Sequence, residues 1–150
     1  MGKDITGHEF EECLHKNKIV KFPDVKASVK RELKAAQDDL KAAIQSLSEN
    51  REKWATIQAY YSMFHTARAL LYSRGYREKS HYCLIVAMKA LFVTERVLDV
   101  SLVEAFQMAK TLRENADYDE YSKKSAESLV DKAKEFLTVG KKILKGRRPL

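Results

Sequence analysis

The sequence contains few of the residues that make turns. Only two prolines and five glycines occur among 150 residues. A protein built from many short strands needs turns at regular intervals, and glycine and proline are the usual residues there. No segment shows the alternating apolar pattern of a half-buried strand. The composition therefore excludes a sheet protein of this size and favours helices.

Long apolar runs are also missing. Acidic side chains interrupt the stretch 4–12, which excludes a secretory signal peptide, and no apolar run is long enough to span a bilayer. The two cysteines, Cys13 and Cys83, match no metal-binding or redox spacing. We therefore expect a cytoplasmic protein whose cysteines are free thiols.

The motifs of common catalytic and cofactor sites are absent. There is no glycine-rich phosphate loop and no His-Glu-x-x-His zinc motif, and the four histidines lack the spacing of metal ligands. Cys83 follows His81 by two residues, but side chains at this spacing point apart on a helix. This argues against a Cys–His nucleophile pair. The sequence predicts neither a metal nor a cofactor.

What the sequence does contain is helical periodicity. Apolar residues recur three and four apart, as one buried helical stripe requires, and the connections are short, which favours antiparallel neighbours. The predicted fold is all-α, an up-and-down antiparallel helical bundle of five main helices plus a short N-terminal helix, in one domain over residues 1–150. The predicted helices cover about 7–17, 23–47, 54–72, 80–92, 101–112 and 122–145, with an extended piece at 19–22.

Several local signals set the ends and faces of these helices. Gly75 suits a left-handed C-terminal cap, Ser80 suits an N-cap, and Ser101 with Glu104 matches a capping box. The helix over 54–72 also carries a stripe of small side chains that would let another helix approach closely. This stripe consists of Ala55, Ala59, Ser62, Thr66 and Ala69.

The same helix carries a polar strip. It consists of Gln58, His65, Arg68 and Tyr72, which are spaced seven, three and four apart and so project from one side. Such a strip could grip a phosphate, because arginine supplies a forked donor and histidine a titratable one. The alternative is a partly buried strip packed against another helix or a subunit, with its polar groups satisfied by hydrogen bonds.

A second polar cluster begins at Arg113 and ends at Tyr118. It lies where a helix is expected to terminate, a usual place for an exposed functional group. Arg113 could equally tie the helix end down by pairing with Asp117.

The net charge is +7, and part of the excess lies near the C-terminus. A basic tail can contact phosphate backbones, or it can be a solvated terminus that aids solubility. The basic residues concerned are Lys141, Lys142, Lys145, Arg147 and Arg148.

Five short motifs occur in order along nearly the whole chain. They are Ile-Val-Lys-Phe before Pro23, Ala-Tyr-Tyr-Ser-Met-Phe-His-Thr-Ala-Arg-Ala-Leu-Leu at 59–71, Gly75-Tyr76, Lys79-Ser80-His81 and Arg113-x-x-Ala-Asp-Tyr118. In this combination the sequence resembles the uncharacterised prokaryotic branch of the HEPN domain superfamily. The resemblance implies an all-helical bundle that forms a homodimer. It also implies a minimal nucleotidyltransferase as partner in a toxin–antitoxin pair.

Several HEPN branches are metal-independent ribonucleases with the motif Arg, four to six residues, His. The position here that resembles the motif arginine is Arg113, but no histidine follows it. Tyr118 stands in place of the base, and an ordinary tyrosine, with a pKa of about 10, is a poor base at neutral pH. Only Arg74 and His81, with six residues between them, satisfy the spacing, and the loop between them is not the family's usual placement.

The sequence thus predicts a HEPN-type binding module that contacts nucleotide or RNA. The ligand-binding candidates are His65, Arg68, Tyr72, Arg113 and Tyr118. The first alternative is a metal-independent RNase toxin, with Arg74 and His81 as catalytic candidates. The second alternative is a structural interaction domain without a ligand.

Overall fold

The computed structural model describes residues 2–23, 25–115 and 121–146. Its six α-helices and one small two-stranded sheet confirm the all-α prediction. No described helix is both long and apolar enough to cross a membrane. The elements are α1 (Gly2–His15), β1 (Ile19–Lys21), α2 (Val25–Ser48), α3 (Glu52–Ser73), β2 (Tyr76–Glu78), α4 (His81–Met88), the π-helical turn η1 (Lys89–Val93), α5 (Val100–Asn115) and α6 (Lys123–Gly146).

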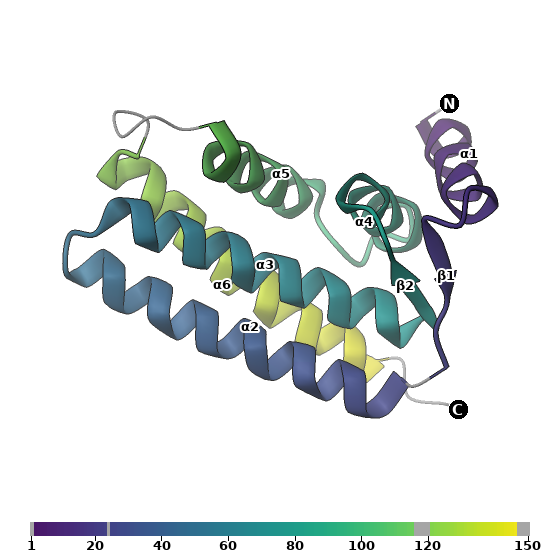
Figure 1. The fold of residues 1–150 in the computed structure, drawn as a ribbon, viewed down its shortest axis with the longest axis horizontal. Coiled ribbons are helices and arrows are strands. Elements are labelled where there is room, and N and C mark those ends of the chain that lie inside the picture. The colour runs from purple at the N-terminus through teal and green to yellow at the C-terminus, as the bar shows by residue number, and fades with distance from the viewer. Residues whose placement is uncertain (1, 24, 116–120, 147–150) are drawn as a thin grey trace.

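Helix α3 is the centre of the arrangement. It runs alongside α2 in the opposite direction, and α6 packs behind this pair (Figure 1). Helices α4 and α5 lie along another side of α3. Helix α1 lies at one end of the molecule, where it packs mainly on α4, η1 and β1. Because α3 contacts most other elements, its side chains face several different surroundings.

The stripe of small residues on α3 is buried, as predicted. The Ser62 hydroxyl donates to the Ala36 carbonyl of α2 at 2.9 Å. Gly140 of α6 lies so close to α3 that a Cβ there would come within 2.8 Å of the Thr66 Cγ2. Small side chains on α3 therefore allow the close approach of α2 on one side and α6 on the other.

The aromatic stripe of α3 is only partly buried. Tyr60 is in the core, whereas Tyr61 and Phe64 are half-buried and Trp54 is 51% exposed. This face of α3 therefore keeps aromatic surface available between α2 and α5.

The short β1–β2 ladder was not predicted. The strands pair antiparallel, with Ile19 opposite Glu78 and Lys21 opposite Tyr76. The extended piece at 19–22 includes β1, but β2 lies in what the sequence shows only as a loop. Three-residue strands are too short for an alternating pattern to be recognisable. The ladder ties the chain before α2 to the chain before α4.

Two of the three predicted caps are confirmed. Gly75 has φ +82° beyond the end of α3, and the Ser80 hydroxyl accepts the Cys83 N–H at 3.3 Å. The capping box at Ser101 is wrong, because α5 begins at Val100 and the Asp99 carboxylate accepts the Ser101 N–H at 2.8 Å. A carboxylate caps a helix N-terminus well and interacts favourably with its dipole.

The prediction of free thiols is also wrong. Cys13 and Cys83 form a disulfide, with a Cα–Cα distance of 5.9 Å across a sequence separation of 70 residues. This distance is usual for a disulfide. The packing of α1 on α4 brings the two residues together, and no local spacing could have indicated the pairing.

Candidate functional site

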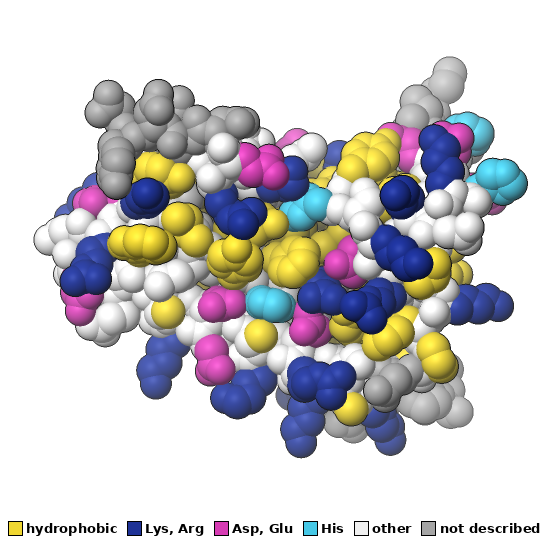
Figure 2. Space-filling view, viewed as in Figure 1, with side chains coloured by type: hydrophobic (Ala, Val, Ile, Leu, Met, Phe, Trp, Pro, Cys, Tyr) yellow, Lys and Arg dark blue, Asp and Glu magenta, His cyan; other side chains and the backbone are white. Residues whose placement is uncertain are grey.

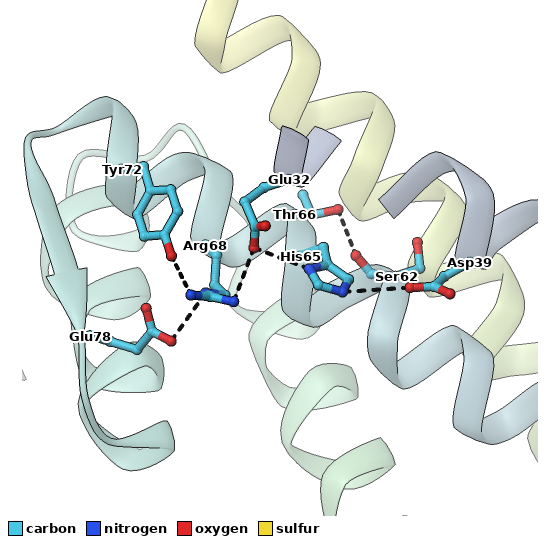
Figure 3. A network of polar contacts seen from close by, with 8 residues as sticks. All are labelled: Glu32, Asp39, Ser62, His65, Thr66, Arg68, Tyr72 and Glu78. Atoms are coloured by element: carbon cyan, nitrogen blue, oxygen red, sulfur yellow. Dashed lines mark hydrogen bonds and ion pairs between the residues drawn. The ribbon is translucent and has the colours of Figure 1, made fainter. Parts of the chain in front are cut away.

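The polar strip of α3 faces the acidic side chains of α2. His65 lies between two carboxylates, with Nδ1 3.1 Å from Glu32 Oε1 and Nε2 3.7 Å from Asp39 Oδ2 (Figure 3). Glu32 and Asp39 are seven residues apart on α2, which is two helical turns. His65 therefore links α3 to α2 at this point.

Arg68 continues this network toward β2. Its guanidinium lies 3.3 Å from Glu32 Oε1 and 3.2 Å from Glu78 Oε2, and it donates to the Tyr72 hydroxyl. All four side chains converge in Figure 3, although they come from α2, α3 and β2. The Arg68 side chain is only 20% exposed and that of Glu78 only 9% exposed. Arg68 therefore joins three elements through mostly buried charges.

The carboxylates of the network have shifted pKa values. Burial alone would raise the pKa of Glu32, but the hydrogen bond with His65 and the charge of Arg68 outweigh it and lower the pKa below 4.5. For Glu78, burial dominates and raises the pKa despite Arg68. Burial likewise raises the pKa of Asp39. The guanidinium and the imidazole thus face three carboxylates, which would repel an anionic ligand.

Arg74, the first catalytic candidate, is held by three other residues. Its guanidinium forms a two-pronged pair with Glu95, at 3.1 and 3.3 Å, and donates to the Leu91 carbonyl at 3.2 Å. It also stacks on the Phe92 ring, 4.5 Å from the ring centroid. Arg74 therefore ties the end of α3 to η1 and the turn after it, and no described contact joins it to His81.

His81, the second catalytic candidate, is the first residue of α4 and lies among aromatic rings. The ring centroids of Tyr60, Phe64 and Phe106 are 5.8, 6.0 and 5.0 Å away. Nδ1 lies 3.3 Å from the Tyr60 hydroxyl, while Nε2 is buried with no hydrogen-bond partner among the described residues. Nε2 is thus withdrawn from solvent, and Nδ1 faces the Tyr60 hydroxyl.

Burial and nearby cations keep His81 neutral. Burial is the larger cause, and the charges of Lys110 and Arg113 on α5 add to it against the opposing charge of Glu114. Together they lower the pKa of His81 to about 4. At neutral pH its imidazole is uncharged, although it lies beside two basic side chains.

Arg113 lies over the aromatic surface of α3. Its guanidinium carbon is 5.2 Å from the Tyr60 ring centroid and 5.1 Å from that of Tyr61. Among the described residues Arg113 has no ion pair, and it is exposed. Lys110, one turn earlier, lies 3.0 Å from Glu114. The alternative pairing with Asp117, like Tyr118 itself, lies outside the described residues.

The fold therefore assembles a second cluster, here named the tyrosine–arginine site. Figure 2 shows a band of hydrophobic side chains across this face, with basic side chains and histidine around it. The site brings α3, α4 and α5 together and consists of Tyr60, Tyr61, His81, Lys110 and Arg113.

Sequence reasoning found Arg113 and His81 separately but not their proximity. It missed Lys110, although a residue three positions before Arg113 lies on the same side of a helix. It assigned no binding role to Tyr60 or Tyr61. Nothing local could show that α5 crosses α3 at these two tyrosines.

The two clusters differ in what they can bind. The network around Arg68 has its cations facing carboxylates, whereas Arg113 lies on an aromatic surface and pairs with no carboxylate in the part of the chain that the structure describes. Such a guanidinium can form two parallel hydrogen bonds with a phosphate. Within the described part of the chain, no group of three or more His, Cys, Asp or Glu side chains could hold a metal ion.

Comparisons with known proteins agree with the motifs. The model of the HEPN domain family matches residues 29–144. Two similar proteins of Methanocaldococcus jannaschii are named "Putative toxin MJ0142" and "Putative toxin MJ0605". Each is 31% identical to this chain. The match to the first covers 79% of this chain and 83% of the relative, and the match to the second covers 81% of this chain and 92% of the relative. A third, "UPF0332 protein PH1297" of Pyrococcus horikoshii, is 30% identical over 51% of this chain and 54% of its own length.

Proposed function

The chain belongs to the HEPN domain family, and on this basis we propose that it is the binding module of a toxin–antitoxin pair. Its ligand would be the phosphate of a nucleotide or of RNA, bound at the tyrosine–arginine site. The names of the two toxin-like relatives support the toxin–antitoxin context. The observation that supports this site is that Arg113 is exposed, lies over the rings of Tyr60 and Tyr61 and has no ion pair among the described residues.

Stacking prepares Arg113 for an anion. A guanidinium that contacts two rings has already lost part of its rotational freedom, so less entropy is lost when a phosphate binds. Lys110 lies nearby but pairs with Glu114 at 3.0 Å, so Arg113 is the main cation of the site. The half-buried ring of Tyr61 offers a surface on which a base can stack. The net charge of +7 attracts anionic ligands generally.

Replacing Arg113 by alanine is expected to weaken RNA binding about tenfold or more, since a hydrogen bond to a charged group contributes roughly 1.5–3 kcal/mol. Fluorescence anisotropy with labelled single-stranded RNA would measure this. Arg77→Ala is a matched control, because Arg77 is also exposed and stacks on a ring, that of Phe22 at 5.7 Å, but outside the site.

A deletion after Leu144 tests the basic tail in the same assay. Lys145, the described basic residue that the deletion removes, lies at the end of α6 and outside the tyrosine–arginine site, so the deletion is expected to weaken binding less than Arg113→Ala does. If only the deletion or Arg77→Ala weakens binding, the assigned site is wrong. If none of the proteins binds RNA or nucleotide, the chain is an interaction domain without a ligand.

We further propose that the protein partner is a minimal nucleotidyltransferase. A toxin requires a partner that restrains it, and the family resemblance points to this class of enzyme. Co-expression with a nucleotidyltransferase encoded beside this chain's gene, followed by size-exclusion chromatography, is expected to give one complex. Separate elution of the two proteins would exclude the pairing.

The chain is also expected to form a homodimer. The aromatic face of α3, with Trp54 51% exposed and Met108 of α5 58% exposed, offers apolar surface that a second copy could cover. Light scattering at micromolar concentration should give about twice the chain mass of 17.3 kDa. The mass of one chain at all concentrations would contradict this.

His81 favours a second candidate function, a metal-independent RNase. A neutral imidazole beside two cations could take the proton of a ribose 2′-hydroxyl while the cations hold the phosphate. In the described arrangement, however, Nε2 is buried and Nδ1 is in contact with the Tyr60 hydroxyl. We therefore expect little cleavage of RNA in the presence of EDTA.

The cleavage assay should compare wild type with His81→Ala and with His65→Ala as control. Robust cleavage by wild type that only His81→Ala abolishes would establish the RNase instead. Since the pKa of His81 is lowered to about 4, a rate that depends on it as a base would rise with pH near 4.

A further inference from the structure

The disulfide joins α1 to α4, the helix that begins with His81, and both of its cysteines are buried. Cys83 is in the first turn of α4, two residues after His81, and Cys13 is near the end of α1. Figure 1 shows α1 at the end of the molecule, next to α4 and away from α5 and α6. The bond therefore fixes α4 to an outer helix.

Two weaker contacts accompany the disulfide. The Tyr82 hydroxyl donates to Glu9 at 2.7 Å, and the rings of Phe10 and Tyr76 meet edge to face at 5.7 Å. The Tyr82–Glu9 bond is exposed to solvent and exposed polar contacts contribute little. The covalent bond is thus the strongest described tie between α1 and the start of α4.

His81 begins α4, and its ring packs against Tyr60 and Phe64 of α3 and Phe106 of α5. Its Nε2 is buried with no hydrogen-bond partner among the described residues, Nδ1 faces the Tyr60 hydroxyl, and Lys110 and Arg113 lie nearby on α5. A buried polar atom without a partner is unfavourable. A rotation of the first turn of α4 would relieve it, and the π-helical turn η1 that follows α4 is an irregular segment able to absorb such a movement.

We propose that the Cys13–Cys83 disulfide is a redox switch that controls the exposure of the His81 imidazole. In the oxidised protein, α1 holds the first turn of α4 in place and His81 stays enclosed. In the reduced protein, α1 separates from α4 and the His81 imidazole turns toward solvent beside Lys110 and Arg113. This goes beyond the proposed ligand-binding function and does not depend on it.

The redox step needs a dithiol reductant. One thiolate of the reductant attacks a sulfur of the disulfide and forms a mixed disulfide, and the second thiolate displaces the protein sulfur. The protein gains two electrons and two protons as two cysteine thiols, and the reductant becomes a disulfide. Both protein cysteines are buried, so attack requires α1 to loosen first. Release of α1 and reduction are therefore coupled.

The test follows the His81 imidazole by NMR in protein with isotope-labelled histidine. In oxidised wild type, His81 is expected to titrate near pH 4. After reduction with dithiothreitol, its midpoint should rise toward the ordinary value of 6.5 and return on reoxidation. His81→Gln identifies the resonance, and His65, held between Glu32 and Asp39, serves as the internal reference.

Two variants distinguish an effect of the disulfide on His81 from a general loosening of the contact between α1 and α4. The double variant Cys13→Ser/Cys83→Ser should show the reduced His81 titration permanently and ignore dithiothreitol. Tyr82→Phe, which removes the hydrogen bond to Glu9 but keeps the disulfide, should behave as oxidised wild type.

Two results would overturn the proposal. In the first, alkylation shows that both thiols are free and yet the His81 midpoint stays near pH 4. In the second, reduction abolishes the helical circular dichroism signal and shifts the NMR resonances of all four histidines together. The disulfide would then stabilise the whole fold and would not act on His81 in particular.

Discussion

Replacing Arg68 by methionine is expected to lower the free energy of unfolding by about 3 kcal/mol. Removing one partner of a mostly buried ion pair leaves the other charge buried and unpaired, which costs roughly 3–5 kcal/mol in well-buried cases. Arg68 contacts both Glu32 and Glu78, whose side chains are 15% and 9% exposed. Urea unfolding followed by circular dichroism at pH 7 would measure the loss, with an unchanged m-value showing that the folded state stays compact.

The size of this loss should depend on pH. Burial already raises the pKa of Glu78 above its ordinary value of 4.5, and without Arg68 it rises further. Where the folded protein binds more protons than the unfolded chain, stability increases as pH falls. The difference between wild type and Arg68→Met should therefore be largest near neutral pH and shrink as the pH approaches 4.5.

Two variants serve as controls for Arg68→Met. Lys34→Ala removes a pair with Asp38 at 3.3 Å that also involves α2 but is exposed, so its effect should be below about 1 kcal/mol. Adding Glu78→Gln to Arg68→Met should recover part of the stability, because it removes one buried charge. If Arg68→Met is no more destabilising than Lys34→Ala, the network does not stabilise the fold.

Replacing both cysteines by serine is expected to lower the free energy of unfolding by about 4 kcal/mol. A cross-link restricts the unfolded chain, and the chain-entropy model gives about this value for a closed loop of 70 residues. Wild type in dithiothreitol should match the double variant in denaturant unfolding. The double variant itself should not respond to dithiothreitol.

The apolar core limits how much stability the protein loses when the disulfide is removed. Helices α2, α3, α5 and α6 pack together without α1, so the reduced protein should stay folded at moderate temperature. A loss below about 1 kcal/mol would show that the unfolded chain gains little freedom from reduction, contrary to the chain-entropy model.

Local sequence patterns determined the helices and the family. Apolar spacing of three and four, together with Gly75 and Ser80 as caps, located the helical segments, because these signals depend on residues one or two turns apart. The small residues of α3 also predicted close helix packing, since the absence of bulk is a property of one helix alone. The separated motifs pointed to the HEPN domain family, which the family model confirms over residues 29–144.

Only the tertiary structure decided what the polar residues do, because each depends on partners far away in sequence. The sequence of α3 alone leaves Arg68 equally suited to bind a phosphate or a carboxylate. In the folded chain Glu32 and Glu78, which are distant in sequence, pair with it and make it part of a network of ion pairs. Arg113 meets the tyrosines of α3, and Cys13 meets Cys83, only because helices far apart in the chain pack together. Periodicity specifies which face of a helix is buried, but not which helix covers it.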